Sequence, residues 1–217
     1  MAAGFFGKVP TRGDFVSRSL PAGFVTPWDD WLQAGVAHSK EILGEAWLDI
    51  YLTSPAWRFA LSADLAGDLA VAGALIPSVD GVGRYFPFTL ACVLEGRPTP
   101  LDLHVQTAWF ERAEALALGV LAEDSSLDDL TLGLEALGRP DPVPALDGEA
   151  WRFDEEAGSL AHALVRSFAP PHGLFWTRGS TRVRPSLLCV RQLPSSAQFT
   201  ALLDGVWAEH GWSDVAP

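Results

Sequence analysis

The feature that most constrains the fold is a pair of uninterrupted apolar runs, residues 69–76 and residues 85–94. Both are short enough for strands and far too short to span a bilayer. A strand without a polar side must be covered on both faces, as in the centre of a layered protein. Pro87 should lie at the start of its strand or on an edge, because proline donates no hydrogen bond to the ladder. These runs predict a central sheet with helices on both sides.

Further strands are indicated on either side of these runs. Residues 4–9 form a short apolar segment before a turn at residues 10–14. Apolar and polar side chains alternate in residues 57–61, which predicts a half-buried strand. Two strands near the end of the chain, residues 173–177 and 184–191, are joined by a hairpin-like turn. Neighbouring strands of this kind favour antiparallel pairs.

Helical periodicity fills the remaining segments. The first helix is expected to begin with Thr26 as its cap and Pro27 in its first turn, and to stop at Gly44. Apolar spacing predicts further helices at residues 45–52, 101–122, 127–137, 160–168 and 199–207. The resulting fold class is α/β, a layered α/β/α sandwich with a mixed, partly antiparallel sheet of roughly six strands.

The length of 217 residues suits a single domain spanning residues 1–217. The loop at residues 139–149 contains three prolines and three carboxylates and is the one plausible internal boundary. The formal net charge of −12 argues against binding to nucleic acid or to an anionic membrane surface. No signal peptide is visible at the N-terminus, so a cytoplasmic protein without membrane insertion is expected. The sequence indicates no oligomeric state.

Patterns that carry catalysis or hold cofactors are missing or incomplete. Gly7 and Lys8 lack the partner residues of a phosphate loop, and the glycines at positions 81 and 83 do not join a strand to a helix. The five histidines are scattered, and no serine lies in a nucleophile elbow. Cys92 and Cys189 lie in apolar runs and are predicted to be buried, reduced thiols. We therefore expect no enzyme activity, no metal and no cofactor.

Two glycine-containing loops, residues 10–15 and residues 77–87, concentrate the polar residues that remain. Loops on a rigid sheet often form binding surfaces, whereas charged side chains in tight turns often brace the turn itself. Both interpretations are equally consistent with the sequence, and a braced loop can also present a surface. The candidate residues for partner binding or loop bracing are Lys8, Arg12, Asp14, Asp80, Arg84 and Tyr85.

Basic residues gather around the predicted hairpin near the end of the chain. They could form a site for an anion or an acidic partner, but solvated hairpin charges are the commoner arrangement and are favoured here. Paired carboxylates at positions 29–30 and 128–129 fall at predicted helix starts, where they serve as caps and dipole partners. The four arginines of the hairpin region are Arg178, Arg182, Arg184 and Arg191.

Four segments resemble the conserved blocks of the TagF/ImpM family. Residues 4–15 read GFFGKVPTRGDF and are similar to the opening GxxGKLPxxGDF signature of the family. Residues 27–33 resemble its PWDxWLQ helix start, and residues 55–61 match its PxWRFAL strand. Residues 73–89, GALIPSVDGVGRYFPFT, are similar to its GxLMPSVDxxGRYFPLT block. Gly81 departs from the basic residue expected at its position.

The resemblance implies a post-translational regulator, usually a repressor, of type VI secretion system assembly. It implies binding of a cytoplasmic forkhead-associated protein, Fha, without catalysis, and an α/β sandwich fold. Two alternatives remain open. One is a small-anion-binding enzyme using Lys8, Arg12, Asp14, Asp80 and Arg84 in one cleft. The other is a structural or accessory subunit of the secretion apparatus, with Trp151 and Trp212 as exposed anchors.

Overall fold

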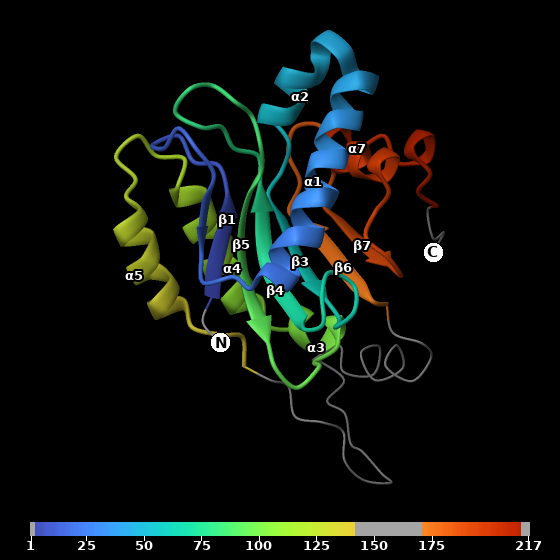
Figure 1. Ribbon diagram of the computed structural model, residues 1–217. Helices are drawn as coiled ribbons and strands as arrows, with labels where there is room; N and C mark the ends of the chain where they lie inside the picture. Colours follow the sequence, from blue (N-terminus) through green and yellow to red (C-terminus); the bar gives the residue numbers. More distant parts are fainter. Residues whose placement is uncertain (1–2, 142–170, 214–217) are drawn as a thin grey trace, which may run out of the picture.

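The computed structural model describes residues 3–141 and 171–213, which build one seven-stranded sheet between two layers of helices (Figure 1). The strand order across the sheet is β2-β1-β5-β4-β3-β6-β7. The strands are β1 (Ala3–Gly7), β2 (Val16–Arg18), β3 (Trp57–Leu61), β4 (Ala70–Ile76), β5 (Phe88–Leu94), β6 (Gly173–Thr177) and β7 (Ser186–Val190).

The helices divide between the two faces of the sheet. One face packs against α1 (Ala22–Leu43), α2 (Trp47–Leu52) and α7 (Ser196–Asp204). The other packs against α3 (Pro100–His104), α4 (Thr107–Gly119) and α5 (Leu127–Leu137). Short 3₁₀ turns occupy Gly44–Ala46 and Ala208–His210. Figure 1 shows α1 and α4 on opposite sides of the central strands, which confirms the α/β/α sandwich.

The sheet differs from the expectation in one respect. Every strand pairing in the described part of the chain is antiparallel, so the parallel pairs of a mixed sheet do not occur there. Short connections join β1 to β2, β3 to β4, β4 to β5 and β6 to β7. Such connections can return the chain only in the opposite direction, because a parallel pair needs a long crossover.

The two apolar runs form the centre of the sheet. Every residue of β4 and of β5 is buried, and Pro87 lies just before β5, as predicted. Strand β3 was predicted to be half-buried, which is wrong, because all of its residues are buried. Its single charged residue, Arg58, lies under α4 and donates from Nε to Glu114 Oε2 at 2.7 Å. An ion pair thus lets a polar position face the core.

The first helix begins earlier than its sequence signals indicate. It starts at Ala22 after Pro21, with no side-chain cap, so the prediction of Thr26 as cap is wrong and Pro27 lies inside the helix. The predicted stop at Gly44 is confirmed, and Trp28, Trp31, Leu32 and Val36 form a buried apolar stripe, whereas Ile42 near the end of the helix is exposed. Trp28 of that stripe is fully buried and donates from Nε1 to Thr89 Oγ1 of β5 at 2.9 Å. The start of α1 therefore lies one turn before the residues that carry the sequence signal, and it has no side-chain cap.

The other predicted elements have mixed outcomes. The long helix expected at residues 101–122 is divided into α3 and α4, and α5 agrees with the prediction. The helix expected at 160–168 and most of the loop at 139–149 lie outside the described residues, so the domain assignment stays a prediction. Cys92 is a buried free thiol, but Cys189 is exposed, which corrects the expectation for that residue. No helix in the described part of the chain is long and apolar enough to cross a membrane.

Candidate functional site

The two glycine-containing loops meet at one end of the sheet. Strands β1 and β4 lie on either side of β5, and both Gly7 and Ile76 pair with Phe88. The chain therefore leaves β1 and β4 at the same level and enters loops 8–15 and 77–87 side by side. Strand register thus brings together residues that are far apart in the sequence.

A buried carboxylate, Asp80, is the centre of this arrangement. Its Oδ2 accepts hydrogen bonds from Lys8 Nζ at 2.9 Å and from Arg84 Nε at 2.7 Å. Its Oδ1 accepts from the backbone N–H groups of Val82 at 3.1 Å and of Arg84 at 2.8 Å. The Asp80 side chain is fully buried and that of Lys8 nearly so. Two cations and two amides thus compensate one desolvated negative charge.

These contacts shift the ionisation of the group strongly. Burial alone would raise the pKa of Asp80, but hydrogen bonds from the Arg84 amide, the Lys8 and Arg84 side chains and the Val82 amide outweigh it. The pKa of Asp80 is therefore held far below its ordinary range. The pKa of Arg84 is raised, chiefly by its hydrogen bond to Asp80 and then by the one to Asp14. Both groups remain charged at neutral pH.

Arg84 also joins the two loops at the surface. Its Nη2 donates to the carbonyl oxygen of Gly13 and to Asp14 Oδ1, the latter at 3.3 Å. Just over half of the Arg84 side chain is exposed, and Asp14 is almost wholly exposed. The guanidinium therefore has one edge on the buried carboxylate and the other on the solvent-facing loop.

Backbone hydrogen bonds fasten the loops further. The Gly81 N–H donates to the Arg12 carbonyl at 2.7 Å, and Ser78 Oγ donates to the Lys8 carbonyl at 2.7 Å. The Tyr51 hydroxyl of α2 accepts from the Ser78 N–H and donates to the Ser78 carbonyl, each at 2.9 Å. A Cβ at Gly81 would lie only 2.9 Å from the Pro10 carbonyl oxygen. The missing basic side chain at this position thus coincides with a close approach of the loops.

An aromatic cluster lies beside the buried charges. Phe15 stacks on Phe6 with ring centroids 5.7 Å apart and meets Phe86 edge-on at 4.9 Å. Lys8 Nζ lies 5.1 Å from the centre of the Phe15 ring. About half of Phe15 is exposed, and Val82 at the tip of the second loop is 69% exposed. The end of the sheet therefore presents apolar groups next to the Arg84–Asp14 pair.

The structure separates the six candidate residues into two roles. Lys8 and Asp80 are buried and brace the loops, whereas Asp14 and Arg84 brace and are exposed. Arg12 contributes its carbonyl to the other loop, and its side chain bonds only to Thr11 of its own loop. Tyr85 is half-buried against Trp47 of α2.

Four further residues at this end of the sheet were not among the candidates predicted from the sequence. Tyr51 and Ser78 hold the second loop in place. Phe15 of the first loop and Val82 of the second supply the exposed apolar surface of this end. Phe15 and Val82 both lie in segments that resemble the family blocks, residues 4–15 and 73–89. An apolar residue within a polar, glycine-containing loop is the sequence signal by which they could have been found. Tyr51 offered no such signal, because its partner lies on another element.

At this end of the sheet, the charged side chains mainly neutralise one another. Lys8, Asp14, Asp80 and Arg84 do converge, as an anion-binding site would require, but Lys8 and Arg84 both direct a nitrogen at Asp80. Within residues 3–141 and 171–213, no group of three or more His, Cys, Asp or Glu side chains could hold a metal ion. The arrangement stabilises a shape and leaves two exposed guanidinium groups, that of Arg84, which is bonded to both carboxylates, and that of Arg12.

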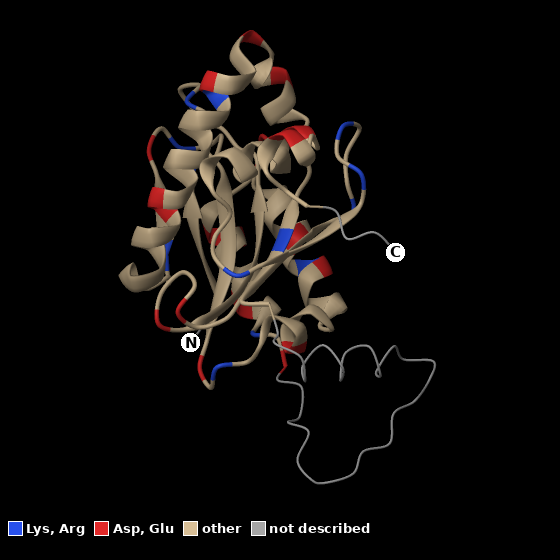
Figure 2. Cartoon of the chain, turned by 90° about the vertical axis from the view of Figure 1, so that its right-hand side faces the viewer, with Lys and Arg blue, Asp and Glu red and all other residues tan. Residues whose placement is uncertain are grey.

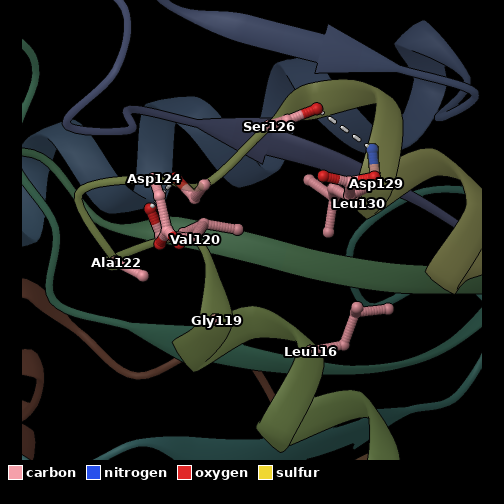
Figure 3. Close-up of a pocket in the computed structure, with 9 residues that line it drawn as sticks. Leu116, Gly119, Val120, Ala122, Asp124, Ser126, Asp129 and Leu130 are labelled. Carbon is pink, nitrogen blue, oxygen red and sulfur yellow. Dashed lines mark hydrogen bonds between the residues drawn. The ribbon is translucent and has the colours of Figure 1, made fainter.

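A separate hollow of about 280 Å³ lies between the end of α4 and the start of α5 (Figure 3). Its floor is apolar and includes Leu116, Val120 and Leu130. The hydroxyl of Ser126 accepts from the N–H groups of Asp128 and Asp129 and caps α5. The paired carboxylates at 128–129 thus lie in a first helical turn as predicted, whereas those at 29–30 lie within α1.

The hairpin arginines are not equivalent. Arg178 pairs with Glu111 and Arg182 with Asp49, so these two charges are compensated within the described chain. Trp212 is partly buried, packs against Trp207 and donates from Nε1 to the Gln198 carbonyl at 3.0 Å. It is therefore fixed to the body of the protein, while Trp151 lies outside the described residues.

Comparison with known proteins adds a family and a structural relative. Residues 4–137 match the family model described as TagF N-terminal domain, type VI secretion system-associated. The structure is similar to the crystal structure of PA0076 from Pseudomonas aeruginosa PAO1, with a TM-score of 0.83 and 36% sequence identity. The similarity covers 100% of this chain and 97% of that one. A comparison with curated proteins gives no match.

Proposed function

Because the chain belongs to the TagF family of type VI secretion system-associated proteins, we propose that it regulates assembly of that system by binding another protein. The proposed partner is the cytoplasmic forkhead-associated protein Fha, and the proposed effect is repression. The protein would act in the cytoplasm and without catalysis. The surface that we assign to this contact is the end of the sheet formed by loops 8–15 and 77–87.

One observation carries the proposal: most of the charges at this end hold two loops together, and the exposed apolar groups Phe15 and Val82 lie in these hydrogen-bonded loops. Phe15 and Asp14 are neighbours in the first loop, Val82 and Arg84 lie two positions apart in the second, and hydrogen bonds join the two loops. Preordered loops lose little conformational freedom on association, and an arginine beside apolar groups is typical of a protein–protein contact.

The same contacts weigh against the anion-binding enzyme. A site for a phosphate or carboxylate substrate needs cations whose charge is available. Lys8 is buried against Asp80, and Arg84 also bonds to Asp80 and Asp14. Of the three cations in the set, this leaves Arg12 without a carboxylate partner in the described part of the chain. A second anion at this place would compete with two carboxylates that are already bound.

The contact can be tested with purified protein and purified Fha-type partner. We call the exposed residues Asp14, Phe15, Val82 and Arg84 the rim, and Val82→Arg and Arg84→Glu change it. Val105→Arg is the matched control. Val105 is 47% exposed and follows α3, which lies at the other end of the sheet (Figure 1). We expect both rim variants to weaken binding at least about tenfold and the control to bind normally. Unchanged binding by folded rim variants would remove these loops from the interface.

The sign of regulation needs a cellular assay. A repressor predicts that deletion increases type VI secretion and that overexpression decreases it. Overexpressed Arg84→Glu should fail to repress if the rim mediates the effect. The same direction of change after deletion and overexpression would contradict repression.

A further inference from the structure

Strand β7 (Ser186–Val190) forms one edge of the sheet, and no strand of the described chain pairs with its outer side. The opposite edge is β2, which has only three residues and is followed by Ser19, a non-glycine residue with a φ of 62°. The two edges are therefore unlike. Strand β7 is long enough to pair with another strand, whereas β2 is too short to do so.

The sequence of β7 lacks the usual protection of an edge. Proteins block edge strands with short length, charged side chains, proline or a bulge, because an open edge pairs with other chains. Strand β7 reads Ser-Leu-Leu-Cys-Val, and Leu187 is 54% exposed. An unblocked apolar edge fits a strand that receives a partner.

A pocket of about 340 Å³ lies beside this edge. Its walls are the β7 segment from Ser186 to Cys189 and the rings of Trp207 and Trp212. Trp207 packs edge-on against Trp57 at 6.1 Å, and the hydrogen bond of Trp212 to Gln198 fixes the second ring. The volume lies near the lower end of ordinary ligand pockets and suits one large apolar side chain.

Charge at the two ends of the strand indicates the kind of partner. Arg184 precedes β7 and Arg191 follows it, and both are exposed without an ion pair inside the described chain. Figure 2 views the molecule from this side and shows basic residues on the loop that leads from β6 into β7. Arg178 and Arg182 of this loop are paired with Glu111 and Asp49, so the uncompensated positive charge beside the strand is that of Arg184 and Arg191. Acidic residues on an added strand would complement it.

We propose that the outer edge of β7 binds an extended segment of another protein by strand addition, with one large apolar side chain in the Trp207–Trp212 pocket. The segment has alternating apolar residues and carboxylates near both ends. Backbone hydrogen bonds to the edge supply affinity, and the pocket and the two arginines select the sequence.

A second copy of this chain fits the edge less well. Antiparallel pairing of β7 with β7 about a two-fold axis would bring Arg184 of one copy toward Arg191 of the other. Like charges at such a junction oppose pairing, and each copy carries the same net negative charge. This surface also lies at the edge of the sheet away from β1 and β2, so it is independent of the contact proposed above.

The test starts with a random dodecapeptide library displayed on phage and selected on the full chain. We expect enriched peptides with an alternating apolar centre and acidic flanks. Synthetic copies should bind Trp212→Ala at least about tenfold more weakly. Arg184→Glu and Arg191→Glu should each weaken binding about fivefold. Arg112→Glu, an equal charge reversal on the exposed side of α4, should bind like the wild type.

Hydrogen exchange locates the bound peptide. Amides of Ser186–Val190 should exchange more slowly when the peptide is present, because outward-facing N–H groups of β7 become hydrogen-bonded. Failure to enrich peptides, basic flanks in the enriched set, or unchanged exchange in β7 would overturn the proposal. So would a dimer in sedimentation that Trp212→Ala dissociates, because a second copy would then be the occupant.

Discussion

The ammonium group of Lys8 lies 2.9 Å from the carboxylate of Asp80, although 72 positions separate the two residues in the chain. The contact exists because β1 and β4 both pair with β5, so their ends meet at one level. It turns two loops into one structural unit.

Asp80→Asn should make the stability of the protein less sensitive to acid. The folded pKa of Asp80 is below its ordinary value of 3.8, so its charge stabilises the fold above that pH and the contribution is lost as the pH falls below it. The free energy of unfolding should therefore differ between wild type and variant by a constant amount from pH 7 to pH 5. The difference should shrink below about pH 4. Urea unfolding at several pH values measures it, and a constant difference down to pH 3 would contradict the assignment.

Lys8→Met and Asp80→Asn should be coupled. Removing the Asp80 charge leaves the buried Lys8 ammonium without its carboxylate, and removing Lys8 leaves Asp80 with Arg84 as its single cation, whereas removing both charges avoids the unpaired ammonium. The double variant should lose less stability than the sum of the two single losses. A double-mutant cycle in urea measures this, with Arg97→Met and Asp64→Asn as an exposed control pair that should be nearly additive. Additive losses for Lys8 and Asp80 would show that the pair is not energetically linked.

Gly7→Ala should be severely destabilising. Gly7 has a φ of 136°, and a Cβ there would lie 2.3 Å from the Pro87 carbonyl oxygen at the base of the second loop. Gly44 also has a positive φ, of 53°, but a Cβ there would meet no atom within 4 Å. Gly44→Ala should cost about 1–3 kcal/mol of backbone strain and Gly7→Ala clearly more. Equal thermal shifts for the two variants would contradict the steric argument.

Thr89→Val should cost about 1–3 kcal/mol, because it leaves the buried Trp28 Nε1–H without an acceptor. Thr200→Val is the matched control, since Thr200 is equally buried and its hydroxyl bonds only to the Ser196 carbonyl one helical turn earlier. The control should cost much less. Chemical unfolding compares the two, and a smaller loss for Thr89→Val would exclude the tryptophan hydrogen bond as a significant stabiliser.

The layered fold was predictable because its strongest signals are local. Two strands without a polar face demand cover on both sides, and the turn and stop signals around Gly44 and residues 178–182 are of short range. Capping signals at Thr26 and Pro27 were misleading, since α1 already begins at Ala22 and buries its first aromatic ring at Phe24. The buried position of Arg58 depends on Glu114 of another element, which periodicity does not reveal.

The sequence was enough to predict which residues belong to the candidate site, but not what each of them does there. The glycine loops and the polar residues within them were found from local composition. Which of them are buried depends on strand register, so Lys8 and Asp80 could not be separated from Asp14 and Arg84 beforehand. The exposed thiol of Cys189 shows the same limit, because an apolar run at a sheet edge resembles one at the centre.

The contact between Gly81 and the first loop has an evolutionary consequence. A relative that carries a side chain at this position must move its own counterpart of residues 10–12 outward, since the Pro10 carbonyl stands in the way. One substitution in the second loop would thereby reshape the first. Changes at these two segments should then be inherited together, and a chimera that exchanges only one of them between relatives should assemble this end poorly.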